Sequence, residues 1–293
     1  MADFTVLDKI EKYARENSLP IYSVVMYNDG QYDERVITPS HLCNDLYSVS
    51  KNFTASAVGM CVDDGILSLD DTVYDIFKDE RPDMNPLWRE VTVERVISQT
   101  VGIEGMFLDI DTEDVFSYPD CDWLDIVLNH PFVYQPGERF AYSDSNFYLA
   151  SRIVAKATGR PMQELLQRRL FTPMKMQGWA WATCPLGHAM GGSGLFITAR
   201  DMAKFGVMYK DGGVFCGRRI LSEEFVSRAT SVVSYPDENG GYGLSFWIPD
   251  RSKTRFTCGG MYNQAIVVDR DLDRVIAWQS HDTGRVGEIW CFI

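Results

Sequence analysis

Ser48 and Lys51 are a serine and a lysine three residues apart at the start of a helix predicted from Ser48 to about Ile66. Residues three apart on a helix share a face, so the lysine amine can reach the serine hydroxyl. A serine hydroxyl needs an adjacent base to act as a nucleophile, and lysine serves as one when burial or a nearby cation lowers its pKa. The pair therefore predicts an acyl-transfer nucleophile. About one such spacing is expected by chance in a chain this long, and a capping serine beside a solvated lysine explains the tetrapeptide alone better.

Further motifs surround and follow this pair. The first motif consists of residues 47–54, which contain Ser48 and Lys51, and residues 63–71, at the end of the predicted helix. The second, residues 135–144, contains a Tyr-x-Asp, and a third segment, residues 191–206, begins with Gly-Gly-Ser-Gly. In this order they resemble the β-lactamase-like serine hydrolases, a family that includes class C β-lactamases, D-amino-acid peptidases and related esterases. The similarity runs from about residue 20 to 280. It is greatest to the branch that contains carboxylesterases and the hydrolase of 6-aminohexanoate dimers.

The resemblance implies a role for each residue that matches a family motif. Ser48 is expected to attack a carbonyl carbon and Lys51 to accept its proton. Tyr142 is expected to pass a proton to the leaving group and to help activate the water that removes the acyl group. The backbone N–H groups of Ser48 and Met261 are expected to form the oxyanion hole, which stabilises the developing negative charge. Asp144 replaces the Asn of the family's Tyr-x-Asn motif and is expected to contact the substrate.

The third family motif, Lys-Thr-Gly or His-x-Gly, is matched least well. Cys258-Gly259-Gly260 stands in its place and is expected to line the substrate site. In relatives that recognise penicillin, cationic or hydroxyl side chains of this motif hold the substrate carboxylate, and Cys258 offers neither. Lys253 and Arg255 lie just upstream and could supply the charge, although exposed cations near a strand end are usually solvated.

These motifs predict a serine hydrolase that forms an acyl-enzyme on Ser48 and cleaves a small ester, amide or β-lactam. Two alternatives stay open: a β-lactamase proper, and a catalytically silent penicillin-binding-like sensor that kept the fold. The sensor hypothesis draws on the missing cation and on Gln99 and Val101, which replace two residues of a His-Thr-Ser-Gly run found in many relatives. A silent module has no need of a base beside its serine, so the hydrolase is favoured.

The composition argues against several other classes of protein, and no cofactor or metal is expected. The four histidines have no metal-ligand spacing, and the seven cysteines include no C-x-x-C pair. A net charge of −13 repels phosphate backbones, which argues against nucleic acid as a partner. No apolar run approaches the roughly 20 residues that a membrane span needs. The scattered cysteines and the lack of a secretory signal favour the cytoplasm. We expect a small-molecule substrate; the oligomeric state is not indicated.

Both ends of the chain are β-rich and the middle is mostly helical. Residues 21–26 and 35–38 flank an Asn-Asp-Gly turn and predict a hairpin after an N-terminal helix. Further strands are predicted at residues 243–248, 255–258, 264–269 and 275–279. These elements predict an α+β fold, an antiparallel sheet with an N-terminal helix beside a mostly helical lobe. The resemblance extends this to a single β-lactamase/transpeptidase-like catalytic domain over residues 1–293.

The sheet lobe is expected at about residues 1–47 and 190–293, and the helical lobe at about residues 48–189. Five tryptophans are assigned to the core: Trp179, Trp181, Trp247, Trp278 and Trp290. The first two are the weaker assignments, because they precede the glycine-rich loop that borders the site in relatives.

Overall fold

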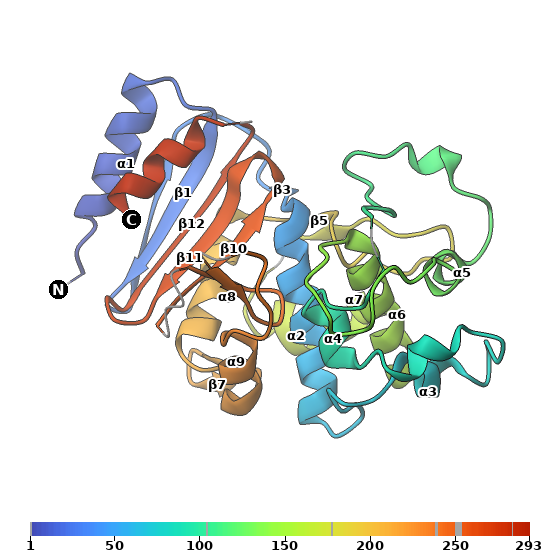
Figure 1. The fold of residues 1–293 in the computed structure, drawn as a ribbon. Coiled ribbons are helices and arrows are strands. Elements are labelled where there is room, and N and C mark those ends of the chain that lie inside the picture. Colours follow the sequence, from blue (N-terminus) through green and yellow to red (C-terminus); the bar gives the residue numbers. More distant parts are fainter. Residues whose placement is uncertain (1, 104, 177, 238–239, 250–253, 283) are drawn as a thin grey trace.

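A seven-stranded antiparallel sheet forms one layer of the molecule (Figure 1). The structure is a computed structural model and describes residues 2–103, 105–176, 178–237, 240–249, 254–282 and 284–293. In spatial order the strands are β2 (Gln31–Val36), β1 (Ile21–Asn28), β12 (Arg274–Ser280), β11 (Gln264–Asp269), β10 (Arg255–Gly260), β9 (Trp247–Pro249) and β8 (Gly240–Tyr242). The first hairpin of the chain thus pairs with its last strand, and the α+β prediction is confirmed.

The strand predicted at residues 243–248 is wrong in its position. Residues 243–246 form the turn between β8 and β9, in which the N–H of Gly243 donates to the carbonyl of Phe246 and Ser245 has a φ of 77°. Leu244 and Phe246 are nevertheless fully buried. Burial of these apolar side chains gives the turn the hydrophobic pattern of a strand.

Helix α1 (Thr5–Glu16) and the C-terminal 3-10 helix η6 (Val286–Phe292) cover one face of the sheet, as Figure 1 shows. Leu7 and Ile10 of α1 and Ile289 of η6 are fully buried in one cluster with Trp278 of β12. Two turns of 3-10 helix are therefore enough to close this face beside α1. Trp290 packs edge-on against Trp278 but is 41% exposed, so its assignment to the core is wrong.

Helix α8 (Ala199–Lys210) covers the opposite face of the sheet and lies against β12, β11 and β1. Gly206 allows this close approach, because a Cβ there would lie 2.6 Å from Val275 Cγ1 and 2.8 Å from Ile266 Cγ2. Beyond α8 come the short ribbon β6 (Val214–Phe215) and β7 (Arg218–Arg219), and helix α9 (Glu223–Ala229).

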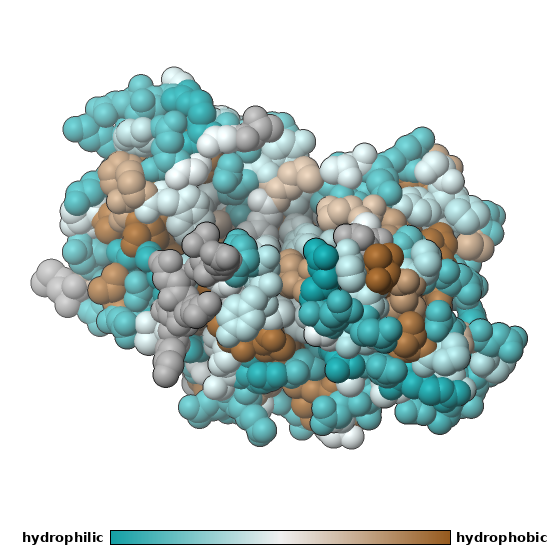
Figure 2. Space-filling model, in the orientation of Figure 1, coloured by the Kyte–Doolittle hydropathy of each residue, from teal (hydrophilic) through white to brown (hydrophobic). Residues whose placement is uncertain are grey.

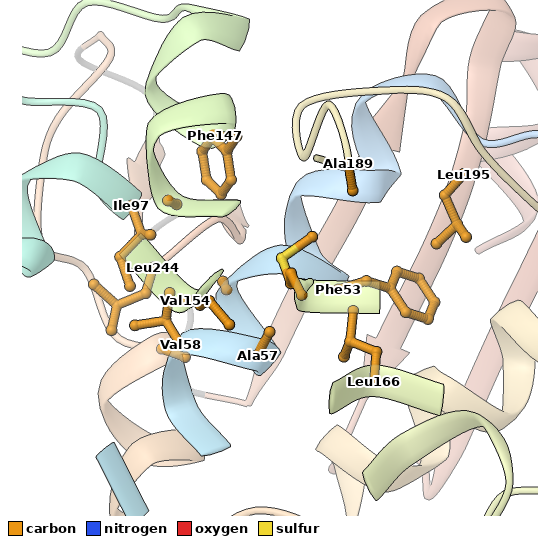
Figure 3. Packing of buried hydrophobic residues seen from close by; sticks show 14 of the residues in the cluster. Phe53, Ala57, Val58, Ile97, Phe147, Val154, Leu166, Ala189, Leu195 and Leu244 are labelled. Carbon is orange, nitrogen blue, oxygen red and sulfur yellow. The ribbon is translucent and has the colours of Figure 1, made fainter. Parts of the chain in front are cut away.

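Helix α2 (Ser50–Asp63) lies between the sheet layer and the other helices, and its residues from Ser50 to Cys61 are buried on every side. Figure 3 shows Phe53, Ala57 and Val58 of α2 in the core, with side chains of the neighbouring helices around them. The ring of Phe53 stacks on that of Phe205 of α8 with centroids 4.0 Å apart. Full burial of such a ring stabilises the fold by roughly 1.5–3 kcal/mol.

The helices beyond α2 are mostly short, and several begin at the side-chain caps that the sequence indicates. The oxygen of Thr92 accepts from the N–H of Arg95, and that of Asp122 from the N–H of Leu124. These helices are α3 (Val73–Phe77), η2 (Pro86–Arg89), α4 (Val93–Ile97), η3 (Val115–Ser117), α5 (Trp123–Leu128), α6 (Asp144–Thr158), α7 (Met162–Leu166) and the π-turn η4 (Gln167–Phe171).

A second, three-stranded sheet has the order β3 (Asn44–Asp45), β5 (Leu195–Ile197) and β4 (Ala180–Trp181). Strand β3 leads directly into the segment that carries Ser48. On the face drawn in Figure 2, hydrophilic residues cover most of the surface and hydrophobic ones form small separate patches. Among the described residues, no helix has the length and apolar character that crossing a membrane requires.

Candidate active site

Ser48 lies in the 3-10 turn η1 (Tyr47–Val49), and helix α2 begins two residues later, at Ser50. The turn is tied back to β3: the N–H of Tyr47 donates to Asp45 Oδ1 at 2.8 Å, and Tyr47 has a positive φ of 49°. A tyrosine in this backbone region is strained, and the surrounding contacts must hold it there. The tight turn leaves Ser48 partly exposed at the entrance to an otherwise buried helix.

Lys51 projects from the first turn of α2 and contacts three oxygen atoms. Its Nζ donates to Ser48 Oγ at 2.8 Å, to Asp144 Oδ1 at 2.5 Å and to the carbonyl oxygen of Gly192 at 2.9 Å. The side chain is only 1% exposed. Three acceptors occupy the three N–H groups of a lysine ammonium, so the site holds the charged form of Lys51 well.

Tyr142 and Asp144 affect the pKa of Lys51 in the direction opposite to burial. Burial by itself lowers the pKa of the Lys51 amine, but the phenol of Tyr142 and the carboxylate of Asp144 outweigh it and raise that pKa above its ordinary value. The structure thus provides the burial that lowers the pKa of a lysine, but neighbouring groups oppose its effect. Asp144, in the place of the family's usual Asn, supplies the extra negative charge.

Tyr142 lies beside this pair, just before helix α6 begins at Asp144. The Nζ of Lys51 is 4.8 Å from the centroid of the Tyr142 ring. On its other side the ring stacks on Trp247 of β9, with centroids 6.1 Å apart and planes 25° from parallel. Trp247 is only partly buried, so its assignment to the core is wrong. It instead forms an aromatic wall of the site.

The edge strand of the site is β10, which ends against the η1 turn that carries Ser48. A Cβ at Gly260 would lie 2.4 Å from the carbonyl oxygen of Leu46 and 3.4 Å from the backbone nitrogen of Ser48. Met261 follows directly in the 3-10 turn η5 (Met261–Asn263). Within the described part of the chain, the N–H groups of Ser48 and Met261 donate no backbone hydrogen bond outside their own turns.

The other residues of this strand differ from the expected substrate-binding set. Gly259 lies under Trp247, since a Cβ there would be 3.9 Å from the indole ring. Cys258 is 1% exposed and belongs to the hydrophobic core, so its thiol is buried away from a substrate site. Arg255 donates to the carbonyl oxygen of Ile293 at 2.7 Å, beside the C-terminal segment. Lys253 lies outside the described residues.

The site brings Ser48, Lys51, Tyr142 and Asp144 together from three segments, with β10 at its edge. A family model described as Beta-lactamase matches residues 23–288, most of the chain. The chain belongs to the β-lactamase family. This confirms the resemblance that the motifs indicate.

Several curated proteins and solved structures are similar to this family member. Penicillin-binding protein 4 of Amycolatopsis lactamdurans is 29% identical over 60% of this chain and 53% of its own length. The 6-aminohexanoate-dimer hydrolase of Paenarthrobacter ureafaciens is 28% identical over 49% of this chain and 41% of its own. This β-lactamase family chain thus spans about half the length of the curated relatives it matches.

The fold is that of solved penicillin-binding proteins. A penicillin binding protein from Bacillus halodurans superposes with a TM-score of 0.75 over 96% of this chain and 98% of its own, at 17% identity. An octameric penicillin-binding protein homologue from Pyrococcus abyssi has a TM-score of 0.76 over 97% and 75%, at 20% identity. The β-lactamase/transpeptidase-like fold is therefore confirmed.

Gly260→Ala is expected to lower kcat of this β-lactamase family member by about 10- to 100-fold on any ester it hydrolyses. The added Cβ meets the carbonyl oxygen of Leu46, which is backbone and cannot move aside, so the end of β10 and the N–H of Met261 shift away from Ser48. Steady-state kinetics measure the loss. Gly259→Ala is the comparison, because its Cβ meets only a side chain at ordinary contact distance. An equal loss in both variants would contradict this account.

Asp111 is an acidic group that the motifs did not indicate. Its two carboxylate oxygens accept from Ser193 Oγ at 2.7 and 2.6 Å, and it lies near Asp109 and Asp144, with one oxygen of each within 4.8 Å of the others. Burial raises the pKa of Asp111 to about 7, aided by the charges of Asp45, Asp144 and Asp109 and opposed by the Ser193 bond. Ionisation of Asp111 near neutral pH therefore adds negative charge beside the Lys51–Asp144 pair.

Asp111→Asn is expected to raise the Tm at pH 8 by roughly 2–4 °C and to leave it nearly unchanged at pH 4. A carboxyl with a raised folded-state pKa contributes stability that is present below about pH 3.8 and is lost as the pH rises through about 7. Asn cannot ionise and still accepts from Ser193. Thermal unfolding at both pH values tests this, and an equal change in Tm at pH 4 and pH 8 would exclude the ionisation as its cause.

Three further features of the site were missed from the sequence. The carbonyl of Gly192 binds Lys51, and its only signal was a place in the Gly-Gly-Ser-Gly run. Trp247 faces Tyr142, which an isolated tryptophan in an aromatic-rich stretch does not reveal. Asp111 belongs to an acidic loop whose spacing matches no family motif. Beside the η1 turn, a pocket of about 280 Å³ is lined by Tyr47, Asp45, Gln264 and His281 among others.

Proposed function

We propose that this member of the β-lactamase family is a serine hydrolase that forms an acyl-enzyme on Ser48. The observation that carries the proposal is the 2.8 Å hydrogen bond between Lys51 Nζ and Ser48 Oγ, made by a lysine that is otherwise enclosed in the protein. An amine at this distance can take the hydroxyl proton without rearrangement, which is the geometric requirement for a general base.

In the proposed mechanism Ser48 Oγ attacks the substrate carbonyl while the neutral form of Lys51 accepts its proton. The N–H groups of Ser48 and Met261 stabilise the oxyanion. Tyr142 then donates its phenolic proton to the leaving group as the bond to the carbonyl carbon breaks. Lys51, now an ammonium beside Tyr142, returns a proton to the phenolate. Water attacks the acyl-enzyme in the second half-reaction and restores Ser48.

We propose a small ester or amide with an uncharged acyl group as the substrate class, in preference to a penicillin. The segment in place of the third family motif supports this, because Cys258 is buried and Arg255 is engaged with the C-terminal Ile293. Trp247 and Tyr142 offer an apolar wall instead of a cation. Among the relatives, a lovastatin esterase of Penicillium rubens is 27% identical over 46% of this chain and 39% of its own length.

Intact-mass spectrometry after incubation with a fluorophosphonate tests the nucleophile. The native protein should gain one phosphonyl group, as Ser48 Oγ displaces fluoride from phosphorus, and Ser48→Ala should gain none. Ser50→Ala is the matched control: Ser50 is two residues away and buried, and its Oγ accepts from the N–H of Leu195 at 3.2 Å. No adduct on the native protein, or an adduct that persists in Ser48→Ala, would overturn the proposal.

Turnover separates the hydrolase from a sensor that traps its acyl group. Sustained release of p-nitrophenol from p-nitrophenyl acetate and butyrate supports the hydrolase. A single stoichiometric burst without turnover would favour the sensor. Faster hydrolysis of the β-lactam nitrocefin than of either ester would overturn the proposed substrate class and favour a β-lactamase proper.

A further inference from the structure

Gln99 is fully buried and contacts the residues on both sides of Tyr142. It follows helix α4, and its backbone turns sharply there, with a φ of 62°. Only a few per cent of residues other than glycine adopt this region, so the backbone conformation of Gln99 is held against a cost. This turn directs both the carbonyl and the side chain of Gln99 towards residues 141–146.

Four hydrogen bonds join Gln99 to the segment that carries Tyr142. The carbonyl oxygen of Gln99 accepts from the N–H of Ala141 at 2.8 Å. Its side-chain Oε1 accepts from the N–H of Ser143 at 3.1 Å, and its Nε2 donates to the carbonyl of Ser143 at 3.1 Å. Oε1 also accepts from Asn146 Nδ2 of α6 at 2.5 Å. The residues on both sides of Tyr142 are thus fixed by one glutamine.

The pairing with Ser143 depends on the shape of the amide group. Ser143 is extended, with φ −154° and ψ 143°, so its N–H and C=O point to the same side of the chain, as in a β-ladder. A primary amide carries an acceptor oxygen and a donor nitrogen on one carbon, so it can accept from the N–H and donate to the C=O of the same extended residue. The nitrogens of an imidazole diverge and cannot make both bonds in this geometry. Tyr142 lies in neither a helix nor a strand. The two hydrogen bonds from the Gln99 amide hold the neighbouring Ser143 backbone as an adjacent strand would.

We infer that Gln99 is a positioning residue that holds the Tyr142 ring between Lys51 and Trp247, so that the phenol is correctly placed for proton transfer. The inference rests on the proposed function, because it assigns Tyr142 the proton transfer to the leaving group. Gln99 touches neither the nucleophile nor the substrate in this scheme. Its contribution is the orientation of Tyr142.

Kinetics of Gln99→Met and Gln99→Glu test the inference. Methionine matches glutamine in length but makes neither bond to Ser143, so kcat for p-nitrophenyl butyrate should fall about 10- to 100-fold, with KM within about three-fold. A protonated glutamic acid reproduces the donor–acceptor pair and a carboxylate does not. The kcat of Gln99→Glu should therefore approach that of wild type at low pH and fall below it as the glutamic acid ionises. Gln99→Met should show no such additional decrease of kcat with rising pH. Equal kcat in wild type and Gln99→Met would overturn the inference.

Gln279→Met is the matched control for a merely structural effect. Gln279 of β12 is also buried, and its side-chain amide also makes two hydrogen bonds, to Ile197 O and from Asn44 Nδ2, but none to residues 141–146. Both variants should lower the Tm, and only the Gln99 variant should lower kcat at a temperature where both are folded. A comparable loss of kcat in Gln279→Met would assign the effect to general loosening of the fold.

A measurement without substrate separates this inference from the proposed function. With 3-fluorotyrosine at position 142, the ¹⁹F resonance should shift or broaden in Gln99→Met and stay unchanged in Gln279→Met. If the wild type hydrolyses no ester but this difference appears, the proposed function fails while the positioning by Gln99 stands. If the wild type is active and the resonance is the same in all three proteins, the positioning fails alone.

Discussion

Lys51→Met is expected to lower kcat/KM for an activated ester by at least about 10³-fold, because it removes the only base in contact with Ser48 Oγ among the described residues. Methionine fills a similar volume without an amine, so the geometry of α2 is preserved. Continuous assay of p-nitrophenyl acetate hydrolysis measures the loss. A rate within ten-fold of wild type would show that another group deprotonates Ser48.

The same substitution leaves the Asp144 carboxylate buried without its cation, since Asp144 and Lys51 are 4% and 1% exposed. An uncompensated buried charge costs about 3–5 kcal/mol, so the single variant is expected to melt well below wild type. The double variant Lys51→Met/Asp144→Asn removes both charges and should recover most of the Tm while remaining inactive. Its inactivity then reports on the missing base and not on unfolding.

Asp144→Asn is expected to move the pH dependence of acylation to lower pH by about one unit and to raise kcat/KM at pH 7 by about 10-fold. In the proposed mechanism, acylation needs the neutral amine of Lys51. Tyr142 and Asp144 raise the pKa of that amine despite its burial, so in wild type the rate should still rise into the alkaline range. Asn keeps an oxygen acceptor for Lys51 Nζ but no charge, which lowers the pKa of Lys51. Rates of fluorophosphonate labelling from pH 5 to 10 measure the shift.

Asp109→Asn is the matched control for the effect of charge. Asp109 is also buried and near Asp144, but its carboxylate accepts from the N–H of Asp111 and from Thr112 Oγ1, and not from Lys51. Asp109→Asn should shift the pH dependence of the labelling rate much less than Asp144→Asn does. A fall in the labelling rate of Asp144→Asn at every pH would show that the carboxylate itself takes part in proton transfer, against the role proposed for Lys51.

Local signals predicted much of this fold and the pairing of Ser48 with Lys51. The three-residue spacing requires only one turn of helix, and the Asn-Asp-Gly turn and the Thr92 cap are defined by their own neighbours. Strands β1 and β11 were predicted closely for the same reason, whereas the second strand of the hairpin, predicted at residues 35–38, is β2 at Gln31–Val36 and begins directly after the turn. The prediction was wrong at residues 243–246, which form a turn. Leu244 and Phe246 are buried there, so their hydrophobic pattern is the same as that of a strand.

The electrostatics of the site could not be predicted from local signals. The raised pKa of Lys51 depends on Tyr142 and Asp144, some 90 residues away, and the pKa of Asp111 depends on how deeply its loop is buried. The direction of the Cys258 side chain depends on which face of β10 meets the core. The position of Trp247 depends on the pairing of a short strand. Each of these is a tertiary property of a residue whose neighbours in sequence are uninformative.

The contact between Gly260 and the turn around Ser48 joins segments more than 200 residues apart in the chain. Ser48, Lys51 and Tyr142 all come from the first half of the sequence, while Met261, the second oxyanion donor in the proposed mechanism, follows β10 near the end of the chain. Such distant contacts form late in folding, because the intervening chain must first be ordered. During refolding, fluorophosphonate labelling of Ser48 should therefore recover later than the helical circular dichroism signal. The rate at which labelling recovers then reports when the sheet is complete.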